Sequence, residues 1–292
     1  SPPDKGEDVR PFLAVAAQLH RYGYSAPRIL AADRVDGFLL LEDLGDVTYG
    51  RALQAGGEEI ALYARAVDLL VDLHCRSGEI GYDVPPYDDA KLVAEVALPL
   101  DWYLPLVLGR ELTGGERAGY VDAWRAALPV LRGAPETLAL RDFHVDNLMD
   151  LPARPGIAGC GLLDFQDAVA GPTTYDLVSL LQDSRRDLAG GLEDAMLDRY
   201  RAGVAIPDEA AFDRSYYGLG AQRGLKVLGI FGRQSALYGN PRYLHHVPRT
   251  WRHVVRDLIL SGLDEVRAWL DRHVPPEARV QPAPDARRNL SR

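Results

Sequence analysis

Hydrophobic residues recur along much of the chain with the period of an α-helix, and the clearest example begins near residue 60. Ile60, Tyr63, Val67, Leu70 and His74 follow one another at spacings of 3, 4, 3 and 4 residues. Side chains at these spacings lie on one face of a helix. The pattern predicts an amphipathic helix, with His74 as a core histidine that finds a hydrogen-bond partner.

The rest of the pattern predicts many helices and little sheet. Residues 37–45, GFLLLEDLG, form an apolar run closed by acids and glycine, which favours a strand that leads into a connector. Thr173 and Asp176 have the spacing of a helix N-cap and its first-turn acid. Helices are predicted at residues 9–24, 87–109 (broken), 116–133, 171–187, 190–201, 208–238 and 251–272.

One short β-hairpin is predicted in the middle of the chain. NLMDL and CGLLDFQD are apolar segments on either side of the turn sequence PARPGIAG. Asn147 opens the first strand and Asp164 closes the second. Antiparallel pairing brings the start of one strand beside the end of the other, so these two side chains are expected to meet.

The composition limits which kinds of binding partner are expected. The chain has 292 residues, 47% of them hydrophobic and 26% charged, with a formal net charge of −9. An acidic chain without a lysine- or arginine-rich run favours neither nucleic acid nor an anionic membrane. Two cysteines, Cys75 and Cys160, are too few for a disulfide framework and favour a cytoplasmic location. No segment is long and apolar enough to span a bilayer.

The hairpin and the loop before it carry the candidate chemistry. An amide oxygen and a carboxylate are few, hard ligands that suit Mg²⁺, which takes its other ligands from water and phosphates. Asp142 lies five residues before Asn147 on the incoming loop, RDFHVDN, and can reach the same volume. One carboxylate that orients a hydroxyl, together with two metal ligands, is the minimal set for phosphoryl transfer.

The spacing D-x-x-x-x-N followed by a hairpin and D-F resembles the catalytic and metal loops of protein-kinase-like phosphotransferases, with Gln166 where protein kinases have glycine. The chain is similar to the aminoglycoside-phosphotransferase-like family. The resemblance implies an α+β, two-lobed protein-kinase-like fold. Residues 1–45 would be a remnant of the nucleotide-binding N-lobe plus hinge, 46–274 a helical C-lobe, and 275–292 a disordered tail.

The same resemblance implies a role for each matching residue. Asp142 would accept the proton of the attacking hydroxyl, and Asn147 and Asp164 would hold Mg²⁺ on the phosphates of ATP. The backbone around Glu42 and Leu44 would bind adenine. The remaining predicted roles are loop support by His144 and Asp176 and acceptor binding by Trp102 and Arg223, although for these four a purely structural role is the alternative.

The strings LRDFHVDNLM, GLLDFQDAVAGPTTYDLVSLL and QRGLKVLGIFGR resemble the bacterial amino-sugar branch of the family. That branch implies phosphorylation of the anomeric hydroxyl of N-acetylmuramate or N-acetylglucosamine in peptidoglycan recycling, with no obligate protein partner. Other small-molecule kinases of this fold, acting on an aminoglycoside, choline or another sugar, stay open. A catalytically inactive binding module also stays open.

One feature of the family is missing from the sequence. Its glycine-rich phosphate loop and sheet lysine would precede the first helix, but only Lys5 lies there, outside any apolar run. We therefore expect a further N-terminal part of the small lobe before Ser1, carrying a strand–turn–strand segment. Without it, one phosphate clamp of the family would be absent.

Overall fold

The computed structural model describes residues 8–80 and 83–283, and side chains are described for all of these except residues 77–80. By their contacts, the residues form two compact units. Unit 1 comprises Ser1–Pro86, Glu136–Leu181 and Leu188–Pro207, and unit 2 comprises Tyr87–Pro135, Gln182–Asp187 and Asp208–Arg292. The predicted lobe boundaries, after residues 45 and 274, differ from this division and stay a prediction.

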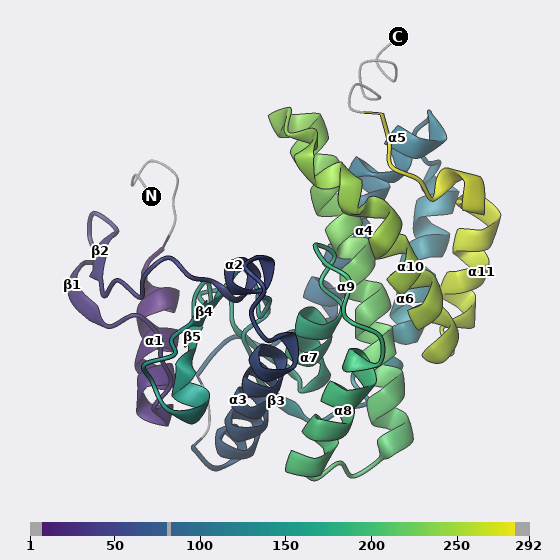
Figure 1. Ribbon diagram of the computed structural model, residues 1–292. Helices are drawn as coiled ribbons and strands as arrows, with labels where there is room; N and C mark the ends of the chain where they lie inside the picture. Colours follow the sequence, from purple (N-terminus) through teal and green to yellow (C-terminus); the bar gives the residue numbers. More distant parts are fainter. Residues whose placement is uncertain (1–7, 81–82, 284–292) are drawn as a thin grey trace. The chain divides into compact units, whose positions relative to one another are not determined.

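Unit 1 combines helices with three two-stranded antiparallel sheets, β1–β2, β3–β6 and β4–β5 (Figure 1). Its elements are α1 (Arg10–Tyr22), β1 (Ile29–Asp33), β2 (Phe38–Leu41), α2 (Tyr49–Gln54), α3 (Glu59–Ile80), β3 (Glu136–Ala139), β4 (Leu148–Asp150), the 3₁₀ turn η2 (Gly156–Gly159), β5 (Cys160–Leu162), β6 (Val169–Pro172), α7 (Thr174–Leu181) and α8 (Leu192–Gly203).

Unit 2 is helical and is organised by its longest helix, α9, which packs on α4, α6 and α10. Glycines permit the close contacts: a Cβ at Gly232 would lie 2.4 Å from the carbonyl oxygen of Trp102 on α4. Its elements are α4 (Asp89–Trp102), α5 (Leu104–Leu108), α6 (Gly114–Leu131), α9 (Glu209–Tyr238), η3 (Pro241–His246), α10 (Val247–Leu260), α11 (Asp264–His273) and η4 (Pro276–Ala278).

The stripe that predicted α3 is confirmed in its centre. Tyr63, Val67 and Leu70 are fully buried, and the His74 Nδ1 lies 2.6 Å from the Tyr200 hydroxyl on α8. Ile60 is 67% exposed, so its place in the stripe was wrong. Ile60 lies in the first turn of α3.

Several element boundaries differ from the sequence pattern. The helix predicted at 251–272 is two helices, because Gly262 adopts a left-handed φ of 70° between α10 and α11. The strand predicted at 37–45 is confined to β2, which pairs with the unpredicted β1. The pair β3–β6 was also missed, since both strands are four residues long and β6 contains Gly171 and Pro172.

The first part of the predicted disordered tail has local contacts. Residues 276–278 form η4, and the carbonyl of Val280 accepts a hydrogen bond of 2.8 Å from the hydroxyl of the buried Tyr103. Disorder of the tail stays a prediction. Residues 284–292 of the predicted tail, and Lys5, lie outside the described residues.

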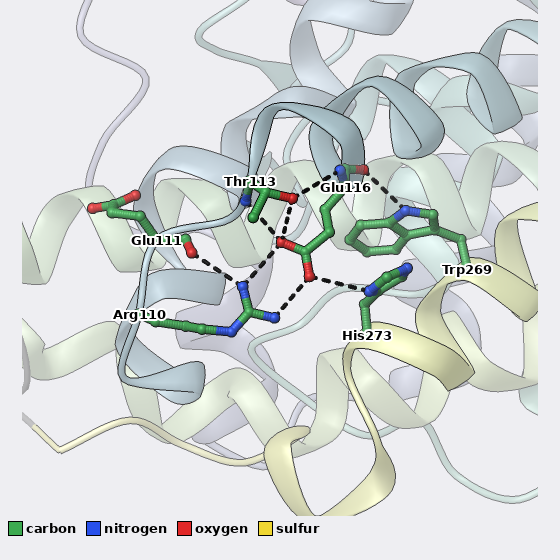
Figure 2. Close-up of polar contacts among 6 residues, drawn as sticks. All are labelled: Arg110, Glu111, Thr113, Glu116, Trp269 and His273. Atoms are coloured by element: carbon green, nitrogen blue, oxygen red, sulfur yellow. Dashed lines mark hydrogen bonds and ion pairs between the residues drawn. The ribbon is translucent and has the colours of Figure 1, made fainter.

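A polar network at the start of α6 shows how unit 2 joins its helices (Figure 2). The Glu116 carboxylate accepts hydrogen bonds from the Arg110 guanidinium (2.8 and 2.9 Å) and from the Thr113 N–H (2.7 Å), completing a capping box. The bond from Arg110 is the main cause that lowers the pKa of Glu116. The Trp269 indole donates to the Glu116 carbonyl (3.0 Å), so α11 is fixed to the first turn of α6.

Candidate active site

The β4–β5 hairpin of unit 1 positions the two predicted metal ligands. Leu148 pairs with Leu162, and the Leu163 N–H donates to the Asn147 carbonyl at 2.9 Å. The strands therefore end with Asn147 and Asp164 at the same open end of the hairpin. Both strands are buried apart from Asp150, and this fixes the register from which the polar ends project.

Connecting segments run along both edges of this hairpin. The Asp150 N–H donates to the Val47 carbonyl and the Leu162 N–H donates to the Ser25 carbonyl, each at 2.9 Å. The side chain of Asp150 forms an ion pair of 2.9 Å with Arg65 on α3. These contacts satisfy the edge groups of a hairpin only three residue pairs long.

The side chain of Asn147 links the catalytic loop, defined here as Leu140–Asn147, to the metal loop, Leu163–Ala168. Its Nδ2 donates to the Asp142 carbonyl (3.0 Å) and lies 3.3 Å from His144 Nε2 and 3.4 Å from Asp164 Oδ2. With the amide nitrogen turned toward these acceptors, the Oδ1 lone pairs remain available for a cation. The structure thus brings Asn147 next to both predicted aspartates.

Backbone conformation marks the same two loops. Among the described residues, only two non-glycine residues have a positive φ: Arg141 (71°) and Asp164 (57°). A left-handed conformation costs an ordinary residue about 1–2 kcal/mol. Such conformations gather at functional sites, where the surrounding structure holds them in place.

Asp176 holds the strained part of the catalytic loop. Its carboxylate accepts hydrogen bonds from the N–H groups of Leu140 (2.5 Å) and Arg141 (2.7 Å), and it is 1% exposed. The Ser179 hydroxyl donates to the Arg141 carbonyl at 3.3 Å. His144 is also buried, and its N–H donates to the Asp142 carbonyl. Both side chains lie where the predicted loop support needs them.

The metal loop contains a buried residue, Phe165, next to an exposed one, Asp164. Phe165 is buried and stacks on Phe12 of α1, with ring centroids 4.8 Å apart. Asp164 is exposed, and its Oδ1 accepts a hydrogen bond of 2.7 Å from the Gln166 amide. The anchored phenylalanine fixes the strand end while the carboxylate stays accessible to solvent.

These residues fit a magnesium ion of the kind that nucleotides carry. Asn147 and Asp164 offer two hard oxygen ligands in one accessible volume, and Mg²⁺ completes its octahedron with waters and phosphate oxygens. A search of residues 8–80 and 83–283 finds no group of three His, Cys, Asp or Glu side chains suited to a metal.

A pocket of about 490 Å³ opens beside the hairpin in unit 1. Its apolar lining includes Met149 on β4 and Leu163, the residue before Asp164. Its polar lining includes Asp46 and Arg51, whose guanidinium donates to the Asp46 carbonyl at 2.7 Å. The full lining is Gly45, Asp46, Thr48, Arg51, Gln54, Asp146, Met149 and Leu163. The lining is mainly polar, with Met149 and Leu163 as its large apolar side chains, and such a mixed surface suits a nucleotide.

The predicted hinge residues lie next to this pocket. Glu42 has its N–H bound to the Arg28 carbonyl (2.8 Å), and its carboxylate pairs with Arg28 and Arg154. Only its carbonyl therefore remains for adenine. A Cβ at Gly161 would lie 3.4 Å from Leu44 Cδ1, so Leu44 packs against β5. Leu44 directly precedes Gly45 of the pocket lining and Glu42 lies three residues before it; their role in adenine binding stays a prediction.

Trp102 and Arg223, the predicted acceptor residues, belong to unit 2. Trp102 ends α4, and its carbonyl faces Gly232 of α9. Arg223 lies nine residues earlier on α9, which corresponds to roughly 14 Å along the helix axis. The structure therefore does not bring these two residues together. Tyr103, the next residue in the sequence, packs inside unit 2, and its hydroxyl accepts a hydrogen bond from the Trp251 indole.

Sequence reasoning missed part of this site. Asp46, Thr48 and Arg51 line the pocket, although the segment assigned to nucleotide binding, LEDLG, ended at Gly45. A second acid directly after a glycine turn was the available signal. Gly50 was missed too: a Cβ there would lie 2.4 Å from Asp146 Oδ1, so this glycine lets the catalytic loop approach α2.

Comparison with known proteins identifies the protein family. The model of the phosphotransferase enzyme family APH matches residues 1–213. The chain belongs to this phosphotransferase family. Among curated relatives, the N-acetylmuramate/N-acetylglucosamine kinase of Caulobacter vibrioides is 38% identical over 282 residues, which cover 93% of this chain and 76% of that protein. The relative of the same name from Pseudomonas aeruginosa is 39% identical, covering 92% and 80%.

Solved structures confirm the predicted protein-kinase-like α+β fold. A choline/ethanolamine kinase family protein from Mesorhizobium loti superimposes with a TM-score of 0.59 at 15% identity, covering 89% of this chain and 82% of that one. The GDP complex of aminoglycoside 2'-phosphotransferase-IIIa gives 0.54 at 17% identity, covering 89% and 82%. At these identities the likeness concerns the fold. No helix among the described residues is long and apolar enough to cross a membrane.

Proposed function

We propose that this chain transfers the γ-phosphoryl group of ATP to the anomeric hydroxyl of N-acetylmuramate or N-acetylglucosamine in the cytoplasm. The observation that carries the proposal is the contact of Asn147 with both Asp142 and Asp164 at the open end of one hairpin. The substrate class is supported by the names of the curated relatives, which are 36–39% identical to this chain.

Each residue has a role in this mechanism. The pocket beside Met149 and Leu163 binds the adenosine part, with the carbonyl of Glu42 and the backbone of Leu44 at the base. Asn147 and Asp164 would hold Mg²⁺, which would neutralise charge on the nucleotide phosphates when bound.

Asp142 orients the attacking hydroxyl and accepts its proton, so catalysis rests on positioning and on charge stabilisation. Asp176 and His144 keep the loop backbone in its strained form. Acceptor binding by Arg223 and Trp102 remains a prediction from the sequence.

The test is turnover of the wild-type protein and of Asp142→Ala with ATP and Mg²⁺ over a panel of acceptors. Wild type should phosphorylate the two amino sugars and neither kanamycin nor choline. Asp142→Ala should lose about 10²–10⁴-fold in turnover, the usual contribution of a positioned general base. It should unfold in urea like wild type, because Asp142 is half-buried and no side-chain hydrogen bond in the described residues depends on its carboxylate.

Other outcomes separate the rivals. Phosphorylation of kanamycin or choline alone would replace the substrate class while keeping the phosphotransferase mechanism. Nucleotide binding without turnover on any acceptor would favour a binding module. Unchanged turnover in Asp142→Ala would remove that residue from the mechanism.

A further inference from the structure

Two buried aromatic residues of unit 1, His74 on α3 and Tyr200 on α8, form a contact that the proposed mechanism does not use. Tyr200 is 1% exposed, and its hydroxyl lies 2.6 Å from His74 Nδ1. The two rings also meet edge to face, with their centroids 5.6 Å apart. A buried hydroxyl costs free energy unless it has a hydrogen-bond partner, so this bond fixes how α8 packs on α3.

The direction of this hydrogen bond follows from burial. Burial lowers the pKa of His74 to about 3, so the imidazole is neutral near pH 7 and one ring nitrogen can accept. Burial raises the pKa of the Tyr200 hydroxyl, so the phenol keeps its proton. A hydrogen bond from the Thr173 side chain acts in the opposite direction on this pKa, which identifies Thr173 as a donor to the phenol oxygen. Tyr200 can therefore accept from Thr173 and donate to His74.

Thr173 connects this pair to the catalytic loop. It directly precedes α7 and is 9% exposed. Asp176 lies three residues later, in the first turn of α7, and its carboxylate accepts the N–H groups of Leu140 and Arg141 at 2.5 and 2.7 Å. A hydrogen bond that holds Thr173 therefore also holds the turn from which Asp176 projects.

The helix that carries Asp176 is short, so its position depends on contacts at its ends. α7 has eight residues, all of them buried. The strand β6 ends at Pro172, immediately before Thr173, and a proline has no N–H with which to fix this junction. The Thr173 side chain instead ties the junction to Tyr200. A displacement of about 1 Å can cost about 100-fold in rate, so the position of this turn bears on turnover.

We propose that Tyr200 is a positioning residue for phosphoryl transfer. By bonding to Thr173 and His74 it fixes the first turn of α7, from which Asp176 holds the catalytic loop. All four residues belong to unit 1. The link to turnover rests on the proposed function. The link to the loop backbone does not, so it can be tested without any substrate.

The experiment compares wild type with Tyr200→Phe, which removes only the hydroxyl, and with Tyr24→Phe as the matched control. Tyr24 is also a buried tyrosine of unit 1, and its hydroxyl donates to Asp72 on the same helix α3 at 2.7 Å. Tyr200→Phe should lower kcat with the amino sugar about 3- to 10-fold, which corresponds to about 0.6–1.4 kcal/mol, and leave KM for ATP unchanged. Tyr24→Phe should keep kcat.

A conservative pair of variants at Thr173 tests the connection to α7. Thr173→Val keeps the shape of the side chain without its hydroxyl and should lose as much kcat as Tyr200→Phe. Thr173→Ser keeps the hydroxyl and should recover most of that loss. Because Tyr200→Phe and Thr173→Val break the same hydrogen bond, the double variant should lose less than the product of the two single losses.

Native-state amide hydrogen exchange keeps the test separate from catalysis. In Tyr200→Phe the Leu140 and Arg141 amides should exchange at least threefold faster relative to those at the centre of α3, and Tyr24→Phe should leave that ratio unchanged. An unchanged ratio in Tyr200→Phe would overturn the proposal, as would a kcat equal to that of Tyr24→Phe. If wild type phosphorylates no amino sugar, the proposed function fails, and the exchange ratio still decides the role of Tyr200.

Discussion

The catalytic loop and the metal loop lie side by side in unit 1, and they hold a left-handed residue in place by different contacts. Each contains one non-glycine residue in the left-handed region, Arg141 and Asp164. At Arg141 the N–H, the carbonyl and the guanidinium all have hydrogen-bond partners. At Asp164 the side chain is exposed and its contacts are short-range polar ones, from Gln166 and Asn147.

The difference follows from what each loop must do. A general base acts only when its carboxylate already stands in the productive position, so the loop before Asp142 is fixed from behind by Asp176. In the proposed mechanism Asp164 would bind and release a nucleotide-bound ion in each cycle, which fits a loop whose buried anchor is the neighbouring residue Phe165. Substitutions that remove the contacts fixing the first loop should therefore damage folding and activity together, and substitutions in the second should damage activity alone.

The largest effect is expected from Asp176→Ala. The change leaves two buried N–H groups, those of Leu140 and Arg141, without their acceptor. Each unsatisfied buried donor costs about 1–3 kcal/mol, so the free energy of unfolding should fall by about 2–5 kcal/mol. Turnover should fall with it, because the loop that carries Asp142 loses its fixed backbone. Urea unfolding and turnover measured on the same preparation check both effects.

The matched control is Asp198→Ala on α8. Its side chain is 79% exposed and pairs only with Arg201 in the same helix, a contact worth a few tenths of a kcal/mol. It should therefore leave stability and turnover close to wild type. An Asp176→Ala protein as stable as this control would show that the catalytic loop does not depend on its brace, and the contrast between the two loops would disappear.

Asp164→Asn should lower turnover without lowering the free energy of unfolding. Asparagine tolerates the left-handed conformation and keeps the shape of the side chain, so stability should stay within about 0.5 kcal/mol of wild type. Turnover should fall about 100-fold or more, because a metal ligand contributes several kcal/mol of charge stabilisation. The Mg²⁺ concentration for half-maximal rate should rise. A stability loss comparable to that of Asp176→Ala would mean that the metal loop is as strongly held as the catalytic loop.

The sequence predicted the part of this site that depends on spacing. The hairpin register follows from two apolar segments around a Pro/Gly turn, and that register alone places Asn147 beside Asp164. The protein-kinase-like fold followed from the same motif. The left-handed residues could not be predicted, because neither arginine nor aspartate encodes a positive φ. The tertiary partners of Arg141, which are distant in sequence, make that conformation tolerable.

Side-chain burial and ion pairing could not be predicted from the sequence either. Helical spacing placed Arg223 and Lys226 on one face, but only the fold shows that Glu95 of α4 pairs with Lys226. Spacing also put Ile60 in the core, since a periodic pattern does not reveal where the neighbouring elements end. The short strands β3 and β6 form through their pairing with each other, which no local pattern in either segment contains.

The smallest effect is expected from Gln166→Ala. The Gln166 amide donates to Asp164 Oδ1 at 2.7 Å, so it occupies an oxygen that an incoming cation would use. Its removal should leave stability unchanged, because both side chains reach solvent. The apparent affinity for Mg²⁺ should tighten about two- to fivefold, which corresponds to about 0.5–1 kcal/mol. A Mg²⁺ titration of turnover beside wild type measures this shift.

The sign of that shift decides what keeps Asp164 in place. If the apparent Mg²⁺ affinity weakens, Gln166 orients the carboxylate, and the metal loop has a brace of its own, smaller than Asp176 but of the same kind. If it tightens, the carboxylate is held by the strand end and Phe165, and Gln166 competes with the ion. In the second case the catalytic loop is fixed by the chain itself, through Asp176. The Asp164 carboxylate of the metal loop would instead be held by the bound ion.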